Sequence, residues 1–79
     1  MPIIISIQPM SNYTIKVKFD NGTTLILDMK AKLKTMRFQQ LKDKNLFCRA
    51  VADKYCIRWN EYIELSVKEI FEIAQKTVE

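Results

Sequence analysis

The sequence predicts a single α+β domain built on an antiparallel β-meander, and three observations support this fold class. Residues 13–29 alternate apolar and polar side chains on both sides of Asp20-Asn21-Gly22. Residues 66–78 carry a helix-capping motif followed by apolar residues at helical spacing. The chain has 79 residues, of which 48% are hydrophobic and one is glycine, so it suits one folded domain spanning 1–79.

The first strand is expected near the N-terminus. Ile3, Ile5 and Ile7 occupy every second position, which predicts a strand from about Ile3 to Gln8. Pro9 has no N–H to donate to a neighbouring strand, so we expect it to end this strand.

The register of the following hairpin can be predicted from its apolar pattern and its turn residues. A two-residue Asn21-Gly22 turn would place Leu25 opposite Lys18 and mix charged with apolar residues on one face. A three-residue loop, with Gly22 in the left-handed conformation, instead gives one apolar face. Its pairs are Val17 with Leu25, Ile15 with Leu27 and Tyr13 with Met29.

Residues 30–44 differ in pattern and charge from the hairpin. Leu33, Phe38 and Leu41 have a spacing that favours short helical turns over a strand. Asp43 is placed to cap a short helix through Asn45–Cys48. We expect the aromatic and leucine side chains of this part, Phe38, Leu41 and Phe47, to pack on the apolar face of the sheet.

The β pattern returns after Arg49. Tyr55, Ile57 and Trp59 alternate with polar residues, and a turn near Asn60-Glu61 leads to a partner strand, which predicts a second small strand pair. That partner strand contains Ile63 and Leu65. We expect Tyr55, Ile57 and Trp59 to share one face, with Trp59 in the core.

The last element is a helix from Val67 to about Lys76 that packs on the sheet. Ser66 and Glu69 form a capping box in which each side chain accepts a hydrogen bond from the backbone N–H of the other. The apolar positions on one face are Val67, Ile70, Phe71, Ala74 and Val78.

Several kinds of chemistry have no residues to support them. The chain has no histidine, which removes the usual general base and the common nucleophile pairs. Cys48 and Cys56 match no zinc spacing, and the lone Gly22 is insufficient for a glycine-rich phosphate loop. We therefore expect no enzyme, no cofactor and no metal site. The two cysteines are predicted to be free and partly buried, although their spacing also allows a disulfide.

Location follows from the apolar runs of the sequence. None approaches the roughly 20 residues needed to cross a bilayer, and the start of the chain lacks the features of a signal peptide. We expect a cytoplasmic protein.

The charge is concentrated in residues 30–44, which carry six basic residues and one acid, a net charge of +5. This segment is either an ordinary solvated face or a docking site for an acidic surface. Exposed Tyr62 is the better aromatic candidate for a binding contact. Contact candidates for a protein partner are Lys32, Lys34, Arg37 and Tyr62. Candidates for nucleic-acid binding are Lys30, Lys32, Lys34, Arg37, Lys42 and Lys44.

Asp28 ends the second hairpin strand beside Lys30. Its carboxylate is expected to cap the following turn, and contact with a partner is the alternative.

The order and spacing of short motifs over nearly the whole chain resemble the domain-of-unknown-function family 2442. These motifs are Pro9, Tyr13, Phe19, Gly22, Asp28, Phe38-x-x-Leu41, Phe47, Ile57-x-Trp59 and Glu64-Leu65 before a last helix. The resemblance implies a small bacterial or phage α+β domain without known activity or cofactor. It also implies an antitoxin of a toxin–antitoxin pair, with the toxin encoded by the adjacent gene.

Two features depart from the family pattern. Relatives carry a glycine in the turn after the tryptophan, where this chain has Asn60-Glu61-Tyr62, and some larger relatives add a helix-turn-helix domain that 79 residues do not accommodate. The leading hypothesis is therefore a non-catalytic protein-binding module. Direct nucleic-acid binding, and a small-molecule-binding or structural domain, are the alternatives. A core this small also leaves homo-oligomerisation open.

Overall fold

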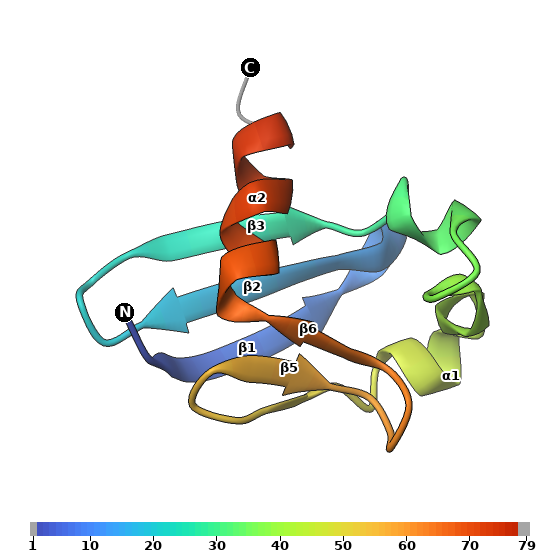
Figure 1. Cartoon of the computed structure of the whole chain (residues 1–79), viewed down its shortest axis with the longest axis horizontal. Coiled ribbons are helices and arrows are strands. Elements are labelled where there is room, and N and C mark those ends of the chain that lie inside the picture. Colours follow the sequence, from blue (N-terminus) through green and yellow to red (C-terminus); the bar gives the residue numbers. More distant parts are fainter. Residues whose placement is uncertain (1, 78–79) are drawn as a thin grey trace.

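A computed structural model describes the backbone of residues 2–77 and the side chains of residues 2–74. It has two three-stranded antiparallel sheets, three short 3-10 turns, one short helix and a C-terminal helix, which confirms the α+β class (Figure 1). The first sheet contains β1 (Ile4–Met10), β2 (Thr14–Phe19) and β3 (Thr24–Asp28). The second contains β4 (Val51–Ala52), β5 (Cys56–Arg58) and β6 (Glu64–Ser66). The helical pieces are η1 (Ser11–Tyr13), η2 (Lys32–Lys34), η3 (Gln39–Lys42), α1 (Lys44–Phe47) and α2 (Val67–Thr77).

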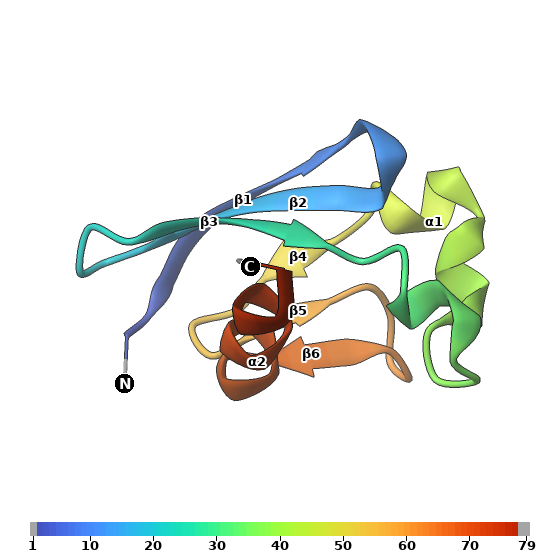
Figure 2. The same ribbon diagram turned by 90° about the horizontal axis from the view of Figure 1, so that it is seen from above.

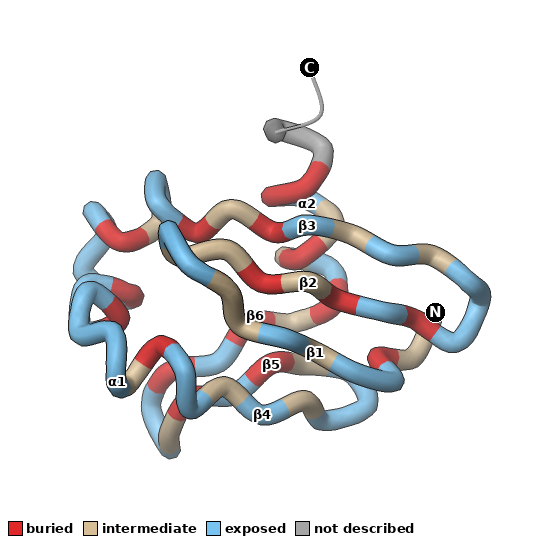
Figure 3. The backbone as a smooth tube through the Cα atoms, turned by 180° about the vertical axis from the view of Figure 1, so that it is seen from behind, coloured by how far each residue is buried: buried red, intermediate tan, exposed pale blue. Residues whose placement is uncertain are grey.

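The two sheets face each other across the core. Figures 1 and 2 show the second sheet in front of β1 and β2, with α2 lying across the same inner face of the first sheet beside β6. The sheets meet where β1 lies next to β4, and the Ile4 N–H donates to the Lys54 carbonyl there at 2.9 Å. Buried positions therefore alternate along the strands and point into this interior (Figure 3).

The predicted hairpin register is confirmed. Ile15 pairs with Leu27 and Val17 pairs with Leu25, and Gly22 has a φ of +89° in the three-residue loop. Ile15, Val17 and Leu27 are fully buried, so one apolar face of the hairpin meets the core. The Met29 N–H donates to the Tyr13 carbonyl at 2.9 Å, which confirms the third predicted pair.

The prediction that Pro9 ends the first strand is wrong. β1 continues to Met10, and Pro9 lies opposite Ile15. The odd-numbered residues of β2 bond to β3, so its even-numbered residues bond to β1, through Gln8 and Met10. The nitrogen of Pro9 therefore faces the outer edge of the sheet, where no N–H is needed.

The buried face of β1 changes near its start and does not follow the alternation of its isoleucines. The register shifts between Ile4 and Ser6, so Ile4 is buried and Ile5 is 62% exposed. An extra residue at such a bulge reverses which side chains point inward. Simple alternation therefore fails for Ile5, although Ile7 still packs against the core.

The helical turns expected in residues 30–48 are present as η2, η3 and α1. Their anchors Leu33, Phe38, Leu41 and Phe47 are all buried in the core. Asp43 caps α1 as predicted, because its Oδ1 accepts a hydrogen bond from the Asn45 N–H at 2.9 Å.

The second sheet has one more strand than the sequence predicted. β4 contains only Val51 and Ala52, which is too short to show any periodicity. Trp59 is buried as expected, and its Nε1–H donates to the Phe47 carbonyl at 3.1 Å. Tyr55 precedes β5 and is 53% exposed, so the prediction that it shares the inner face is wrong.

The capping box at the start of α2 is confirmed. The Glu69 N–H donates to Ser66 Oγ at 3.2 Å, and the Ser66 N–H donates to Glu69 Oε1 at 3.1 Å. Val67, Ile70 and Ala74 are buried on the inner side of the helix. The predicted position Val78 lies outside the described residues.

We predict that Gly22→Ala lowers the free energy of unfolding by about 1–2 kcal/mol, because a Cβ disfavours the positive φ. No atom lies within 4 Å of the position that this Cβ would take, so the loss is conformational and not steric. Urea unfolding measures the effect. Gly22→Asn is the matched control and should lose less, because asparagine tolerates positive φ better. Equal losses for both variants would contradict this account.

Candidate protein-binding surface

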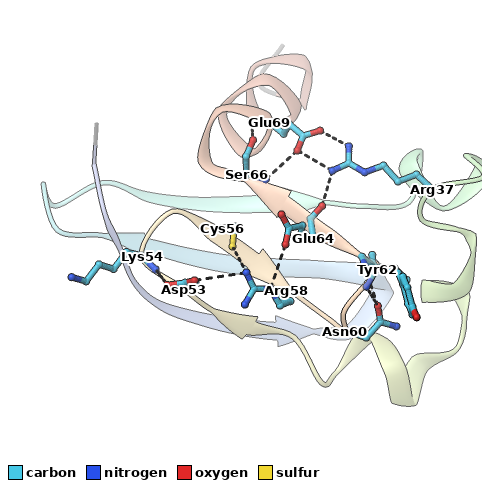
Figure 4. Close-up of polar contacts among 11 residues, drawn as sticks. Arg37, Asp53, Lys54, Cys56, Arg58, Asn60, Tyr62, Glu64, Ser66 and Glu69 are labelled. Carbon is cyan, nitrogen blue, oxygen red and sulfur yellow. Dashed lines mark hydrogen bonds and ion pairs between the residues drawn. The ribbon is translucent and has the colours of Figure 1, made fainter.

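Arg37 joins the segment 30–44 to the second sheet and to α2. Its guanidinium forms a two-point ion pair with the Glu69 carboxylate, and its Nη2 also donates to the Glu64 carbonyl at 2.7 Å (Figure 4). The guanidinium carbon lies 4.6 Å from the centre of the Phe38 ring. Planar, two-point recognition of a carboxylate is the contact that arginine makes better than lysine.

This ion pair occupies the outer edge of β6. Hydrogen bonds between Trp59 and Ile63 show that odd-numbered β6 residues face β5, so Glu64 and Ser66 direct their backbone groups outward. Arg37 binds the Glu64 carbonyl, and Glu69 binds the Ser66 N–H. The two side chains thus occupy one carbonyl and one N–H of this edge, which an additional strand would otherwise bind.

The same contacts change the acidity of Glu69. Its hydrogen bonds from Arg37, and to a smaller extent from Ser66, lower the pKa of its carboxyl from 4.5 to about 2, against the opposing effect of partial burial. The paired carboxylate likewise raises the pKa of Arg37. Glu69 therefore stays ionised in acid well below the usual range of a glutamate.

A second polar cluster covers the outer face of the second sheet. Arg58 lies 3.3 Å from Glu64 and 3.8 Å from Asp53, and its Nη2 lies 3.8 Å from the Sγ of Cys56. These ionic side chains are at least half exposed, so the pairs contribute little to stability. Beside them is an open cavity of about 470 Å³, lined by Val51, Ala52, Asp53, Arg58, Trp59, Asn60 and Glu61.

One end of the molecule combines positive charge with exposed apolar side chains. Figures 1 and 2 both place the turn between β5 and β6 beside the segment 30–44. Met36 is 87% exposed and Tyr62 is 86% exposed on these two segments. We call this surface the basic end; its residues are Lys34, Met36, Lys42, Lys44 and Tyr62.

The charge of the basic end differs from the charge counted along the sequence. Lys30 pairs with Asp28 at 3.2 Å, and Arg37 pairs with Glu69. Among the described side chains, Lys34, Lys42 and Lys44 have no ion pair. Lys32 also has no ion pair among the described side chains but is half-buried, so the exposed unpaired cations of the segment 30–44 are Lys34, Lys42 and Lys44.

The structure separates the four predicted partner contacts into two groups. Lys34 and Tyr62 are exposed on the basic end, whereas Arg37 is held by Glu69 and Glu64. Lys32 is half-buried beside α2, where it lines a small cavity with Glu69, Glu72 and the core residue Ile73. Lys32 and Arg37 are therefore engaged within this chain and are less available for contact with a partner.

The sequence analysis missed Met36. It lies between the core anchors Leu33 and Phe38, three positions after Leu33, so helical spacing would place it on the buried side. Its exposure therefore has no signal in the local pattern.

Asp28 takes the predicted capping role. Its Oδ1 accepts a hydrogen bond from the Lys30 N–H at 2.9 Å, and this bond lowers the pKa of the Asp28 carboxyl.

The cysteines are both free, and only Cys56 is partly buried as predicted. Cys48 is exposed, because the last turn of α1 directs Phe47 inward and the next residue outward. Burial raises the pKa of the Cys56 thiol.

Within the described part of the chain, no three histidine, cysteine or acidic side chains gather as metal ligands would. No helix among the described residues is long and apolar enough to cross a membrane.

Residues 4–76, from β1 to the last turn of α2, match the family model described as "Protein of unknown function (DUF2442)". The chain belongs to this family. No curated protein and no solved structure matches the chain. The matched residues include both sheets and the basic end. The family description assigns no activity to its members.

We predict that Glu69→Gln lowers the free energy of unfolding at neutral pH by about 1 kcal/mol, because the ion pair with Arg37 is lost while a capping oxygen remains. The Glu69 contribution is complete above pH 4.5 and disappears as the pH falls towards 2. The difference between the two proteins should therefore shrink over this interval. Urea unfolding at several pH values measures it. Glu72→Gln, on the same helix, is the charge-matched control, and an equal effect there would contradict this assignment.

Proposed function

We propose that this chain is a non-catalytic protein-binding module whose basic end docks on an acidic surface of a partner protein. Its most concrete form is the antitoxin half of a toxin–antitoxin pair, in which the chain covers the active surface of the toxin by contact. The partner is then the product of the adjacent gene. No chemistry by this chain is needed for that mechanism.

The observation that carries the proposal is that two exposed side chains, Met36 and Tyr62, lie on the same end of the molecule as lysines that form no ion pair. Met36 and Tyr62 are both more than 80% exposed, and Lys34 ends η2 two residues before Met36. Tyrosine and methionine are enriched at the centres of protein interfaces. Burying either side chain in a partner would contribute about 1.5–3 kcal/mol.

The basic end is also held in a defined shape. Leu33, Phe38 and Leu41 anchor its turns in the core, and Arg37 fixes the stretch beside Met36. A surface that is already ordered loses less conformational entropy when it binds. This supports recognition by a preformed surface.

The state of Glu69 supports a non-catalytic assignment. Among the described groups, this carboxylate has the most strongly shifted pKa, and that shift comes mainly from its bonds to Arg37 and Ser66. A general base works best with a pKa near the working pH, and this carboxyl is shifted in the opposite direction.

The test is co-purification with the product of the adjacent gene. We predict that the product is toxic when expressed alone and is retained by the wild-type chain. Lys34→Glu combined with Tyr62→Ala should weaken retention at least tenfold, since both changes fall on the basic end. Lys18→Glu, on the outer face of β2, makes the same change of charge and should retain the partner. A product that is neither toxic nor retained would contradict the proposal.

Nucleic-acid binding is the competing function, supported by the unpaired Lys34, Lys42 and Lys44. Lys30 and Arg37 are already paired with acids, which leaves fewer cations for phosphates than the sequence suggests. We predict binding of a duplex or single strand no tighter than roughly 10⁻⁴ M at 50 mM salt. Fluorescence anisotropy at 50 and 200 mM salt measures it. Tighter binding that falls steeply with salt would favour nucleic acid over a protein partner.

A further inference from the structure

A further open cavity lies between the turn that joins β1 to β2 and the short helix α1. Figure 2 shows these two elements side by side at one end of the first sheet. The cavity has a volume of about 360 Å³, within the range of pockets that hold a ligand. Its walls are mainly apolar and include Pro9, Met10, Tyr13 and Phe47.

Tyr13 gives this cavity a fixed wall. Its hydroxyl donates to the Lys42 carbonyl, and its ring meets the Phe47 ring edge to face, with the two ring centres 5.3 Å apart. The φ angles of Asn12 and Tyr13 are +61° and +58°. Asparagine tolerates this conformation, but tyrosine rarely adopts it. Such residues persist where the surrounding structure holds them, and they cluster at binding sites.

Three lysines surround the cavity. Lys44 lines it directly and is exposed. Lys42 is adjacent, because its carbonyl accepts the bond from Tyr13. On the opposite side, the Nζ of Lys30 donates to the carbonyl of Asn12, a lining residue, at 3.4 Å. The electrostatic potential at the cavity therefore favours a negatively charged group.

No acidic side chain offsets this charge among the described residues that line the cavity. Asp28 and Asp43 lie close along the chain, but Asp28 pairs with Lys30 and Asp43 caps α1. The other two cavities named above are different, because each is lined by two acids. These acids are Asp53 and Glu61 in one cavity and Glu69 and Glu72 in the other.

We propose that this cavity receives an apolar side chain, flanked by carboxylates, from an acidic segment of the partner protein. The inference rests on the proposed function, since Lys42 and Lys44 belong to the basic end and the cavity continues that surface towards η1. The incoming side chain packs against Tyr13 and Phe47, and the flanking carboxylates pair with the two lysines. Side chains that fill preformed pockets carry much of the binding energy of interfaces.

A synthetic peptide tests the cavity without the partner. The probe is acetyl-Asp-Phe-Asp-amide, titrated into the isotope-labelled full chain and followed by NMR. We expect shifts at the amides of Tyr13, Phe47 and Cys48, with a Kd on the order of 1 mM at low salt. Acetyl-Asp-Gly-Asp-amide lacks the apolar side chain, and acetyl-Lys-Phe-Lys-amide reverses the charge. Each of these control peptides should bind about tenfold more weakly or less.

Two variants of the chain test the same site. Cys48→Trp places a large ring at the cavity and should weaken binding of the probe about tenfold. Asn45→Trp is the matched control, because Asn45 is also exposed on α1 but does not line the cavity. Lys44→Glu should weaken binding as well, whereas Lys18→Glu, on the outer face of β2, should not. Circular dichroism checks that each variant is folded.

The titration has clear contrary outcomes. The absence of shifts up to about 10 mM probe, equal binding of the control peptides, or binding that survives both Cys48→Trp and Lys44→Glu would overturn the proposal. Phenylacetate that binds more tightly than the probe would assign the cavity to a free organic acid, and would also overturn it.

The product of the adjacent gene separates this inference from the proposed function. Cys48→Trp should weaken its retention about tenfold, and Asn45→Trp should retain it as the wild type does. Retention that survives Cys48→Trp would overturn this inference and leave the proposed function standing. A product that the wild-type chain does not retain would contradict the proposed function, while the peptide titration still decides whether the cavity binds an acidic segment.

Discussion

The ion pair between Arg37 and Glu69 is the contact on which the rest of the arrangement depends. It connects the turns of residues 30–44 to the edge of β6 and to the first turn of α2, which follows β6 directly in the chain. Glu69 serves both the capping box of α2 and the ion pair, so the start of the helix and the position of the segment 30–44 are set together. A single carboxylate thereby fixes two elements that lie far apart in the sequence.

Small domains have little core with which to hold long connections, and this fold uses side-chain bonds to the backbone in place of additional strands. Trp59 donates to the Phe47 carbonyl and so ties α1 to the second sheet. Arg37 does the same for the edge of β6. These bonds keep the connecting segment on one end of the molecule, where the stretch around Met36 is exposed between the buried Leu33 and Phe38.

Local rules predicted the parts of the fold that depend on neighbouring residues. The loop at Gly22, the cap at Asp43 and the capping box at Ser66 are each decided within a few positions, and all are confirmed. Pro9 was placed wrongly because its effect depends on which strand lies beside it. Two-residue β4 and the exposure of Tyr55 depend on the meeting of the two sheets, which no local pattern contains.

The candidate surface was predictable in location but not in composition, for an electrostatic reason. Charge counted along residues 30–44 treats all six cations alike, yet Arg37 is neutralised by a residue 32 positions away. An arginine that holds one backbone carbonyl and one carboxylate is poorly suited to release them for a partner, because the Glu64 carbonyl and the Glu69 carboxylate would lose their bonds to it. In the proposed binding role, contact with a partner would therefore fall to exposed side chains of the basic end such as Lys34, Met36 and Tyr62.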